Sequence, residues 1–292
     1  MIRQLNLNLH TNHPFDLQNC LEGRQDFRWR KLPNGSYSGV LNGTLIHIRQ
    51  SDDRLLYEAT TNADLTGLLT SYFRLTDDLD AIYTKNAARD DRIAALIENH
   101  PGVRLMRQPD PWECLVSYIC SARATPPRIT HRVERTATRL GRPLTLNSET
   151  RHTFPDPQTI LDAGPDHLVQ MNLGFDRVPH AITEAAQRIL DGRLDLRRLA
   201  QPDILYDEAV SQLSDLYCVG PKIANCVALF ALDKTDAFPV DSRVRNTVKR
   251  LYPSLIHSTD ADIVQWAQDL FGPHAGYANQ FLYMGLSGPV TS

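Results

Sequence analysis

The chain has 292 residues, of which 42% are hydrophobic and 22% charged, and its formal net charge is −3. This composition is that of a globular protein with a sizeable core, in one large domain or two ordinary ones. The negative net charge argues against a basic surface that binds nucleic acid over its whole extent, but it is compatible with one local basic patch that does so. The longest apolar run, CVALFAL at 226–232, is too short to span a bilayer, and the N-terminus lacks the apolar core of a signal peptide. We expect a cytoplasmic protein without membrane contact.

Five cysteines stand at positions 20, 114, 120, 218 and 226, and none of them forms a C-x-x-C pair. That spacing argues against a zinc site, a redox pair and an iron–sulfur cluster. We therefore expect buried thiols, no metal held by side chains and no cofactor.

The first elements along the chain are predicted to form an antiparallel sheet. Asn34-Gly35 and Asn42-Gly43 stand between alternating apolar residues, and Asn-Gly is the strongest short indication of a β-hairpin. The strands are expected near 27–32, 36–41, 44–49 and 54–59. From about residue 64 the apolar period becomes that of helices.

The rest of the chain is predicted to be helical, with everything after residue 105 in helices and their connections. A helix should open at Asp110-Pro111, and others are expected at 127–140, 157–163, 178–190, 203–216, 221–232, 242–251, 260–271 and 274–285. The class is α+β, with an N-terminal antiparallel β-sheet domain (1–105, sheet plus helices) packed on a mainly α-helical domain (106–292).

A helix, a tight turn and a second helix are predicted within 203–232. The turn CVG is followed by Pro221, which suits the first helical position. Val219 and Gly220 should leave the first N–H groups of the second helix pointing outward, where they can hold a phosphate without a basic side chain.

Lys222 follows Pro221 directly, where the positive end of the helix dipole disfavours a cation. Together with partial burial, the dipole should leave more of the amine neutral, and only a neutral amine is a nucleophile. The alternative is an exposed lysine that contacts phosphate, and the local pattern does not separate the two.

Asp241 ends the motif FPVD and precedes the helical run SRVRNTVKRLY, where an aspartate makes a good N-cap. It is then either a helix cap alone, or a carboxylate that shares a cleft with Lys222. Spacing does not decide whether the two side chains meet.

These residues resemble the helix-hairpin-helix DNA glycosylases with a GPD-type catalytic loop. The turn VGPK, the helix after it and PVD nineteen residues after the lysine carry the likeness. FRW at 27–29, PWECLVSYICS at 111–121, VALFALDK from 227 and LFGPHAGYANQFLY at 270–283 resemble the 8-oxoguanine DNA glycosylase branch. The resemblance runs from about residue 15 to 286.

The resemblance implies that a damaged nucleotide is flipped out of duplex DNA into a pocket. Lys222 would attack C1′ of its sugar, displace the base and form a Schiff base, after which β-elimination nicks the strand. Asp241 would stabilise the cationic sugar and assist the proton transfers. The resemblance also leaves room for an alkali cation held by backbone carbonyls of the hairpin.

The base pocket implied by the resemblance departs from the family in several places. Asn279 stands where glutamine is usual, and Tyr283 replaces a stacking phenylalanine. Arg24 stands where the family has the glycine whose carbonyl reads the N7 hydrogen of the oxidised base, and Gly23 is adjacent. The predicted pocket residues are Gly23, Arg24, Cys226, Pro239, Asn279 and Tyr283.

The predicted contacts with the orphaned base and the backbone also differ from the family. The loop SARATPPR at 121–128 has Arg123 where the family has an asparagine-rich stretch, while Arg128 matches an arginine that contacts the orphaned cytosine. Within NLGFDRV, Phe175 matches a wedge aromatic and Arg177 a second arginine. Cys218 stands at a usual glycine position before the hairpin.

The sequence is therefore interpreted as a bifunctional DNA glycosylase and β-lyase for 8-oxoguanine, acting on damaged double-stranded DNA as a monomer. It would work at the nucleoid of a prokaryote or in a nucleus. Two alternatives stay open, namely the same chemistry on another damaged base and a non-catalytic DNA-binding module. A monofunctional alkyl-base glycosylase is less favoured, because it would not need the lysine.

Overall fold

The computed structural model describes residues 2–7, 14–175 and 177–285. Its strands are β1 (Arg3–Asn6), β2 (Arg30–Lys31), β3 (Tyr37–Leu41), β4 (Thr44–Ser51), β5 (Arg54–Ala59), β6 (Pro143–Leu146) and β7 (Glu149–His152). Its α-helices are α1 (Leu17–Glu22), α2 (Thr66–Tyr72), α3 (Leu79–Ala87), α4 (Asp91–Asn99), α5 (Pro111–Ile119), α6 (Pro126–Leu140), α7 (Pro157–Gln170), α8 (Arg177–Leu190), α9 (Leu196–Leu199), α10 (Tyr206–Ser214), α11 (Pro221–Phe230), α12 (Ser242–Leu251), α13 (Asp260–Phe271) and α14 (Ala275–Met284).

The predicted α+β class is confirmed, and the large sheet has the order β1-β5-β4-β3-β2 with antiparallel pairing throughout. The Asn42-Gly43 turn joins β3 to β4, and both residues have the positive φ that such a turn requires, 46° and 72°. The strand expected at 27–32 is reduced to the two residues of β2. The prediction missed β1, which pairs with β5 at the far edge.

The prediction of helix everywhere after residue 105 is wrong at one place. Residues 143–152 form the two-stranded sheet β6-β7, in which Leu146 pairs with Glu149 around a two-residue turn. Asn147 in that turn has a φ of 53°, a conformation that asparagine tolerates better than most residues. The alternation in PLTLNSETRH is therefore that of a hairpin.

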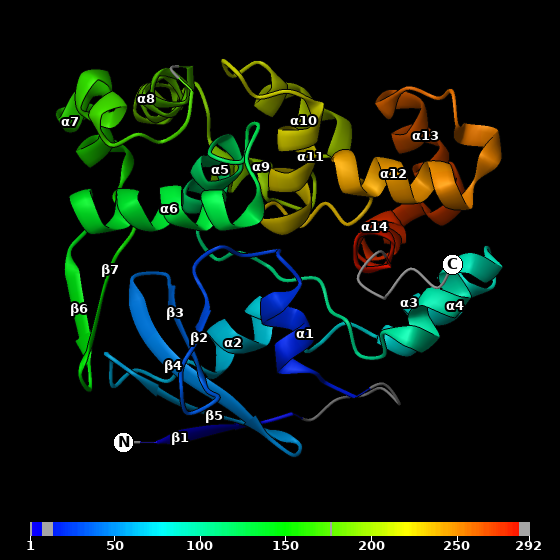
Figure 1. The fold of residues 1–292 in the computed structure, drawn as a ribbon, viewed down its shortest axis with the longest axis horizontal. Coiled ribbons are helices and arrows are strands. Elements are labelled where there is room, and N and C mark those ends of the chain that lie inside the picture. Colours follow the sequence, from blue (N-terminus) through cyan, green and yellow to red (C-terminus); the bar gives the residue numbers. More distant parts are fainter. Residues whose placement is uncertain (1, 8–13, 176, 286–292) are drawn as a thin grey trace.

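Figure 1 shows two layers, with helices α5 to α14 above the large sheet and α6 running across the boundary between them. The smaller core lies between the sheet and helices α1 and α2. The larger core joins α3 and α4 to the helices after residue 110. The boundary at residue 105 stays a prediction, but it does not coincide with the division between these two cores. In the described part of the chain, no helix is long and apolar enough to cross a membrane.

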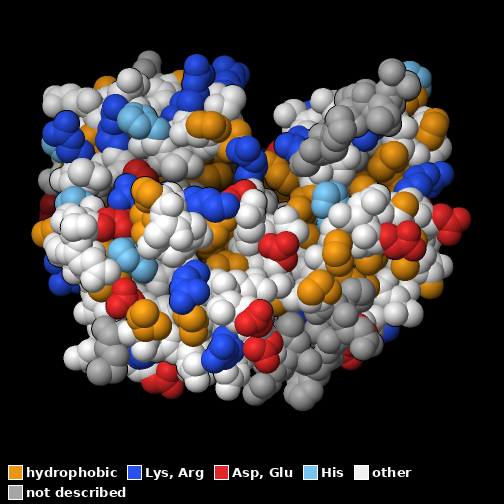
Figure 2. Space-filling view, turned by 60° about the horizontal axis from the view of Figure 1, so that its bottom comes forward, with side chains coloured by type: hydrophobic (Ala, Val, Ile, Leu, Met, Phe, Trp, Pro, Cys, Tyr) orange, Lys and Arg blue, Asp and Glu red, His pale blue; other side chains and the backbone are white. Residues whose placement is uncertain are grey.

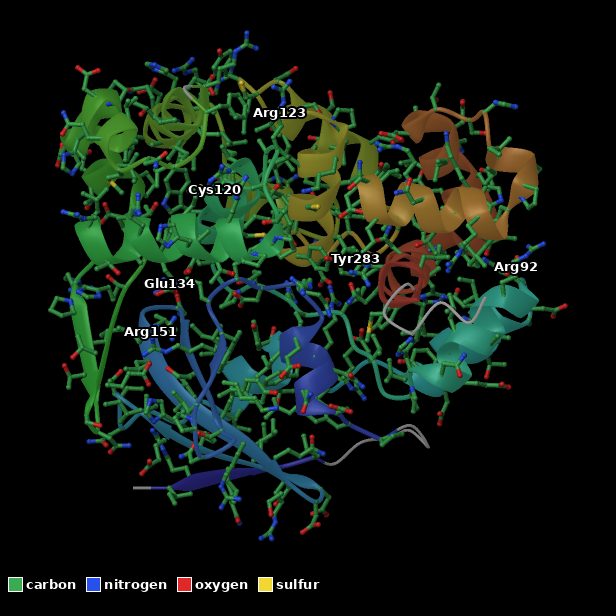
Figure 3. The ribbon with its side chains drawn as sticks, viewed as in Figure 1. Arg92, Cys120, Arg123, Glu134, Arg151 and Tyr283 are labelled. Atoms are coloured by element: carbon green, nitrogen blue, oxygen red, sulfur yellow. The ribbon has the colours of Figure 1, made fainter. Side chains whose placement is uncertain are left out.

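A buried group of charges joins the two layers, and we call Arg28, Glu113, Glu134 and Arg151 the Arg28 cluster. Arg28 donates to Glu113 on α5 at 3.0 Å and to Glu134 on α6 at 2.8 Å. Arg151 on β7 donates to the same Glu134 oxygen at 2.7 Å. Figure 3 shows Glu134 and Arg151 where α6 meets the small sheet. Both arginine side chains are no more than 3% exposed, so each is matched by carboxylate in the interior.

Candidate active site

A cavity of about 1110 Å³ opens among helices α5, α6, α11, α12, α13 and α14 and the turn after α1. Figure 2 shows a notch between two lobes, with lysine and arginine side chains gathered around it. The predicted site residues that line the cavity are Gly23, Arg24, Arg123, Gly220, Lys222, Cys226, Pro239, Asp241, Asn279 and Tyr283. The fold therefore brings most of the predicted site into one place.

The cavity wall is locally basic although the whole chain is acidic. Its basic side chains are Arg24, Arg123, Lys222, Arg243 and Arg245, and its acidic ones are Asp241 and Asp260. Asp260 is already paired, because it accepts a hydrogen bond from Arg245 at 2.5 Å. The remaining positive charge makes the cavity attractive to an anion such as a nucleic acid backbone.

The start of α11 is an open helix terminus, as predicted. Pro221 occupies its first position, and the cap residue Gly220 provides no side-chain hydrogen bond. A Cβ atom at Gly220 would meet nothing within 4 Å, so this cap residue borders open space. The N–H of Val219 is not part of this surface, because it donates to Leu216 and the Val219 side chain is buried. The backbone N–H groups that could meet a phosphate therefore begin after Val219.

The amine of Lys222 is held by two groups from α5 and the residues that follow it. Lys222 Nζ donates to Ser121 Oγ at 2.8 Å and lies 5.3 Å from the centroid of the Tyr118 ring. Among the residues that the structure describes, no carboxylate lies within ion-pair distance of Nζ. The lysine is therefore partly buried, faces the cavity and is held without an ion pair.

Asp241 caps α12 as predicted, since its Oδ1 accepts from the Val244 N–H at 2.8 Å. The loop before it is fixed to α11 by Asn225, which the sequence did not single out. Asn225 Oδ1 accepts from the Phe238 N–H at 3.1 Å, and its amide donates to Pro221 O at 2.9 Å. Asn225 thus sets the approach of the Asp241 loop to the helix start that carries the lysine.

The charges of both predicted catalytic residues, Lys222 and Asp241, act on the thiol of Cys226. Burial raises the pKa of its thiol to about 11, with Lys222 acting to lower it and Asp241 to raise it. Both charges are therefore close enough to influence one buried sulfur. Because this thiol is neutral at physiological pH, Cys226 serves as an apolar wall and not as a nucleophile.

Asn279 and Tyr283 on α14 lie one helical turn apart and both face the cavity. Asn279 is buried, and its amide already donates to Pro239 O at 2.9 Å. The Tyr283 ring, labelled in Figure 3, is covered by the Arg243 guanidinium 4.9 Å from its centroid. Burial first, and then the negative charge of Asp241, raise the pKa of the Tyr283 phenol, while nearby arginines oppose this.

The turn after α1 forms another wall. Arg24 has a φ of 61°, the left-handed region that favours glycine, which fits a position where the resembled family has glycine. The Gly23 carbonyl accepts from Gln280 Nε2 at 3.1 Å. A Cβ atom at Gly23 would lie 2.7 Å from Asn19 O, so a side chain there would disturb the turn. Gln280 is a pocket residue that the sequence did not reveal.

The remaining predicted DNA contacts lie outside the cavity or on its edge. Arg123 lines the cavity, and its guanidinium lies 5.6 Å from the Phe175 ring, which joins two predicted contacts from distant segments. Arg128 and Arg177 are exposed on the surface and do not line the cavity. Cys218 has a φ of 61°, as a residue in a glycine position before the hairpin requires.

Comparison with known proteins agrees with this geometry. A family model described as the N-terminal domain of 8-oxoguanine DNA glycosylase matches residues 6–115. A probable N-glycosylase/DNA lyase of Methanothermobacter thermautotrophicus is 30% identical over 227 residues, which cover 72% of this chain and 71% of that protein. The chain belongs to the 8-oxoguanine DNA glycosylase/lyase family.

Other members of this glycosylase/lyase family match over more of the chain. The N-glycosylase/DNA lyase OGG1 of Arabidopsis thaliana is 28% identical over 274 residues, covering 89% of this chain and 74% of that protein. The structure of MBOgg1 in complex with a low-affinity DNA ligand has a TM-score of 0.88 and 29% identity, and covers 97% of this chain and 94% of that chain. Both parts of the fold, sheet and helices, are thus those of the family.

Proposed function

We propose that the protein is a bifunctional DNA glycosylase and AP lyase that removes 8-oxoguanine from duplex DNA during base excision repair. The observation that carries the proposal is the position of Lys222, whose amine faces a basic cavity and has no carboxylate within ion-pair distance among the described residues. Membership of the glycosylase/lyase family supports the reaction and the substrate.

In the first step a neutral Lys222 amine attacks C1′ of the flipped nucleotide. The C1′–N9 bond breaks as the C1′–Nζ bond forms, and its electron pair leaves with the base, which takes up a proton. The Asp241 carboxylate stabilises the positive charge that develops on the sugar. It also accepts the proton that Nζ loses on becoming bonded to carbon.

In the second step the C1′–O4′ bond breaks, O4′ takes up a proton from Asp241 or water, and a protonated Schiff base forms between C1′ and Nζ. Loss of a C2′ proton then drives cleavage of the C3′–O3′ bond, which nicks the strand and releases the fragment on the 3′ side with a 5′ phosphate. Water hydrolyses the Schiff base and returns the free lysine. Each step uses only the lysine, a proton acceptor and water.

The pocket and its surroundings support a flipped purine. The cavity volume of about 1110 Å³ exceeds what one base needs, so part of the sugar–phosphate backbone would enter with it. Arg123 on the Phe175 ring would stand at the gap in the duplex and contact the orphaned base. We propose that the protein acts at the chromosome, in a nucleoid or a nucleus, and that it acts as a monomer.

An alkali cation remains part of the proposal for the hairpin. Leu216 O accepts one hydrogen bond from Val219, and a carbonyl oxygen has a second lone pair for a cation. Such an ion would draw the DNA backbone to the open start of α11, and the catalytic steps do not depend on it.

Borohydride trapping on a duplex with 8-oxoguanine opposite cytosine tests the proposal. The parent protein should give a covalent adduct and release the base, whereas Lys222→Gln should do neither. Lys85→Gln is the matched control, because Lys85 is exposed on α3 and does not line the cavity. Equal incision by the parent and Lys222→Gln would exclude the lysine as the nucleophile.

A second candidate is the same chemistry on another damaged base. The hydrogen bond from Gln280 to the Gly23 carbonyl favours it, because that carbonyl lies beside the position expected to read the N7 hydrogen of 8-oxoguanine. A panel of duplexes with different lesions separates the two candidates. Duplex binding without release of any base would instead indicate a non-catalytic DNA-binding protein.

A further inference from the structure

The residue that follows the C-cap of α5 contacts the proposed nucleophile directly. We infer that Ser121 is a positioning residue for Lys222, which fixes the nitrogen at the cavity wall and turns its lone pair toward the substrate. Ser121 Oγ lies 2.8 Å from Lys222 Nζ, although the two residues are 101 positions apart. The inference rests on the proposed role of Lys222.

The hydroxyl of Ser121 can meet the amine only as an acceptor. Its single hydrogen is used, because Ser121 Oγ donates to the Tyr118 carbonyl at 2.5 Å. A serine hydroxyl that already donates its one hydrogen can take part in further hydrogen bonds only as an acceptor. Lys222 must therefore point an N–H at Ser121, and the lone pair of the neutral amine then points away from α5. The open space on that side is the cavity.

The Tyr118 ring covers another side of the Lys222 amine, and this ring is itself held by packing and a hydrogen bond. The ring stacks on Phe230 at 5.8 Å with an interplanar angle of 12° and meets the edge of Phe27 at 5.5 Å. Its hydroxyl donates to Gln25 O at 3.3 Å. Both supports of Lys222 therefore come from one packed segment, and a site held on a rigid element is more precise than one held on a loop.

Ser121 is a neutral partner, and this suits a lysine that must give up a proton. A carboxylate in the same place would hold the ammonium more strongly, since hydrogen bonds between charged groups are about twice as strong as neutral ones. The charged and titratable groups that line the cavity together with the amine are Arg24, Tyr118, Arg123, Cys226, Asp241, Arg243, Arg245, Asp260 and Tyr283. Of these, Asp241 is the proposed acceptor of the proton.

The test compares Ser121→Ala with the parent in single-turnover excision across a range of pH. We expect the plateau rate to fall about 10- to 100-fold, because small displacements of a reacting group cost rates of that order. The acidic limb of the pH–rate profile should move to lower pH, since the ammonium form loses an acceptor. The affinity for uncleaved duplex should stay within about twofold of the parent value, because Ser121 acts on the reacting group and not on the backbone.

Three variants make the result specific. Ser117→Ala is the matched control, because Ser117 is equally buried on α5 and does not line the cavity. Ser121→Thr keeps the hydroxyl and should restore most of the rate. Ser121→Cys keeps the size with a weaker acceptor, so it should give an intermediate rate, and it serves as the test if Ser121→Ala fails to fold.

The inference is overturned if Ser121→Ala, or Ser121→Cys in its place, keeps both the parental plateau and the parental pH profile while Lys222→Gln is inactive. An equal loss in Ser117→Ala would also overturn it, by showing a general effect of α5. A parent protein that releases no base, or a fully active Lys222→Gln, would instead be a failure of the proposed function.

Discussion

The Arg28 cluster and the cavity differ in how their buried positive side chains are paired with other groups. In the cluster, Arg28 and Arg151 are almost fully buried and share the Glu134 carboxylate, with Glu113 as a further partner of Arg28. In the cavity, the partners of the Lys222 amine within the described part of the chain are a hydroxyl and an aromatic ring. The cluster balances its arginines with carboxylates of the protein itself, whereas the cavity leaves positive charge for a ligand to neutralise.

This difference separates stability from function in one molecule. Matched buried charges are costly to break and fix how the sheet meets the helices. An unmatched lysine at a helix start gives up some stability, and such local violations are expected where a protein does chemistry. Substitutions in the Arg28 cluster should therefore change the free energy of unfolding with little effect on the excision rate. Substitutions in the cavity should change the excision rate with little effect on the free energy of unfolding.

Among substitutions that separate stability from function, Asp241→Asn is expected to have the largest effect, and that effect is on the excision rate. Asparagine caps a helix as well as aspartate, so the free energy of unfolding should change by less than about 0.5 kcal/mol. The excision rate should fall by about 10²- to 10⁴-fold, because the variant loses the proton acceptor. Single-turnover kinetics and denaturant unfolding measure the two quantities.

Asp156→Asn is the control for this cap, because Asp156 caps α7 through the Thr159 N–H and lies outside the cavity. It should leave both quantities unchanged. A parental excision rate in Asp241→Asn would reduce Asp241 to a cap alone.

A stability effect of about 3 kcal/mol is expected from Glu134→Ala, which removes the shared partner of two buried arginines. Burial disfavours the Glu134 charge, but Arg28 and Arg151 outweigh it and lower the pKa of this carboxyl below its usual 4.5. Its contribution to stability is therefore complete above pH 4.5 and is lost as the pH falls through the lower folded value.

Unfolding in urea at neutral and acidic pH checks this. The difference between parent and variant should shrink in acid, and Glu98→Ala, an exposed change on α4, should show no difference at any pH. A variant as stable as the parent at pH 7 would show that the cluster does not hold the layers together.

A smaller effect, about tenfold in lesion preference, is expected from Gln280→Ala. The change frees the Gly23 carbonyl from its donor, so this carbonyl, next to the Arg24 carbonyl that is predicted to read the N7–H of the substrate, becomes a second acceptor for it. Excision of 8-oxoguanine should rise relative to that of a lesion without an N7 hydrogen, as rates on two duplexes would show. Gln265→Ala, an exposed change on α13, is the control, and an unchanged ratio in Gln280→Ala would remove Gln280 from base selection.

The smallest effect concerns thiol chemistry in the cavity wall. Because the fold raises the pKa of Cys226 from 9.0 to about 11, its thiol favours the folded state below pH 9.0 and loses that contribution as the pH rises through about 11. An aromatic disulfide reagent at pH 8 should modify the partly exposed Cys218 and leave Cys226 intact. Cys218→Ser should abolish this fast reaction. Rapid modification of Cys226 at pH 8 would show that the thiol is exposed or ionised.

Local patterns predicted much of the fold. Helices α12 and α13 begin and end at the expected residues, since Asp241 and Thr259 cap them through nearby N–H groups. Gly164, with a φ of 74°, interrupts α7 where a helix end was expected before Pro165. The hairpin at 143–152 was missed because its turn, Asn147-Ser148, lacks the glycine that marks the other predicted turns.

The sequence indicated the candidate reactive residues of the site, but not the residues that hold them or neighbouring groups in place. The resemblance to the glycosylases indicated Lys222 and Asp241, and the fold places both on one cavity. Nothing near Ser121 or Gln280 in the sequence marks a partner, because their contacts join residues 101 and 257 positions apart.

The sequence by itself determined where helices and turns begin, which residue types could react and which family the chain resembles, because caps, turns and motifs act through atoms only a few residues apart. Only the tertiary structure decided that a serine after α5 holds the lysine, that a glutamine on α14 occupies the Gly23 carbonyl, and that four charges close the boundary between sheet and helices. Those contacts depend on how whole elements pack, and packing brings together side chains that no local pattern relates.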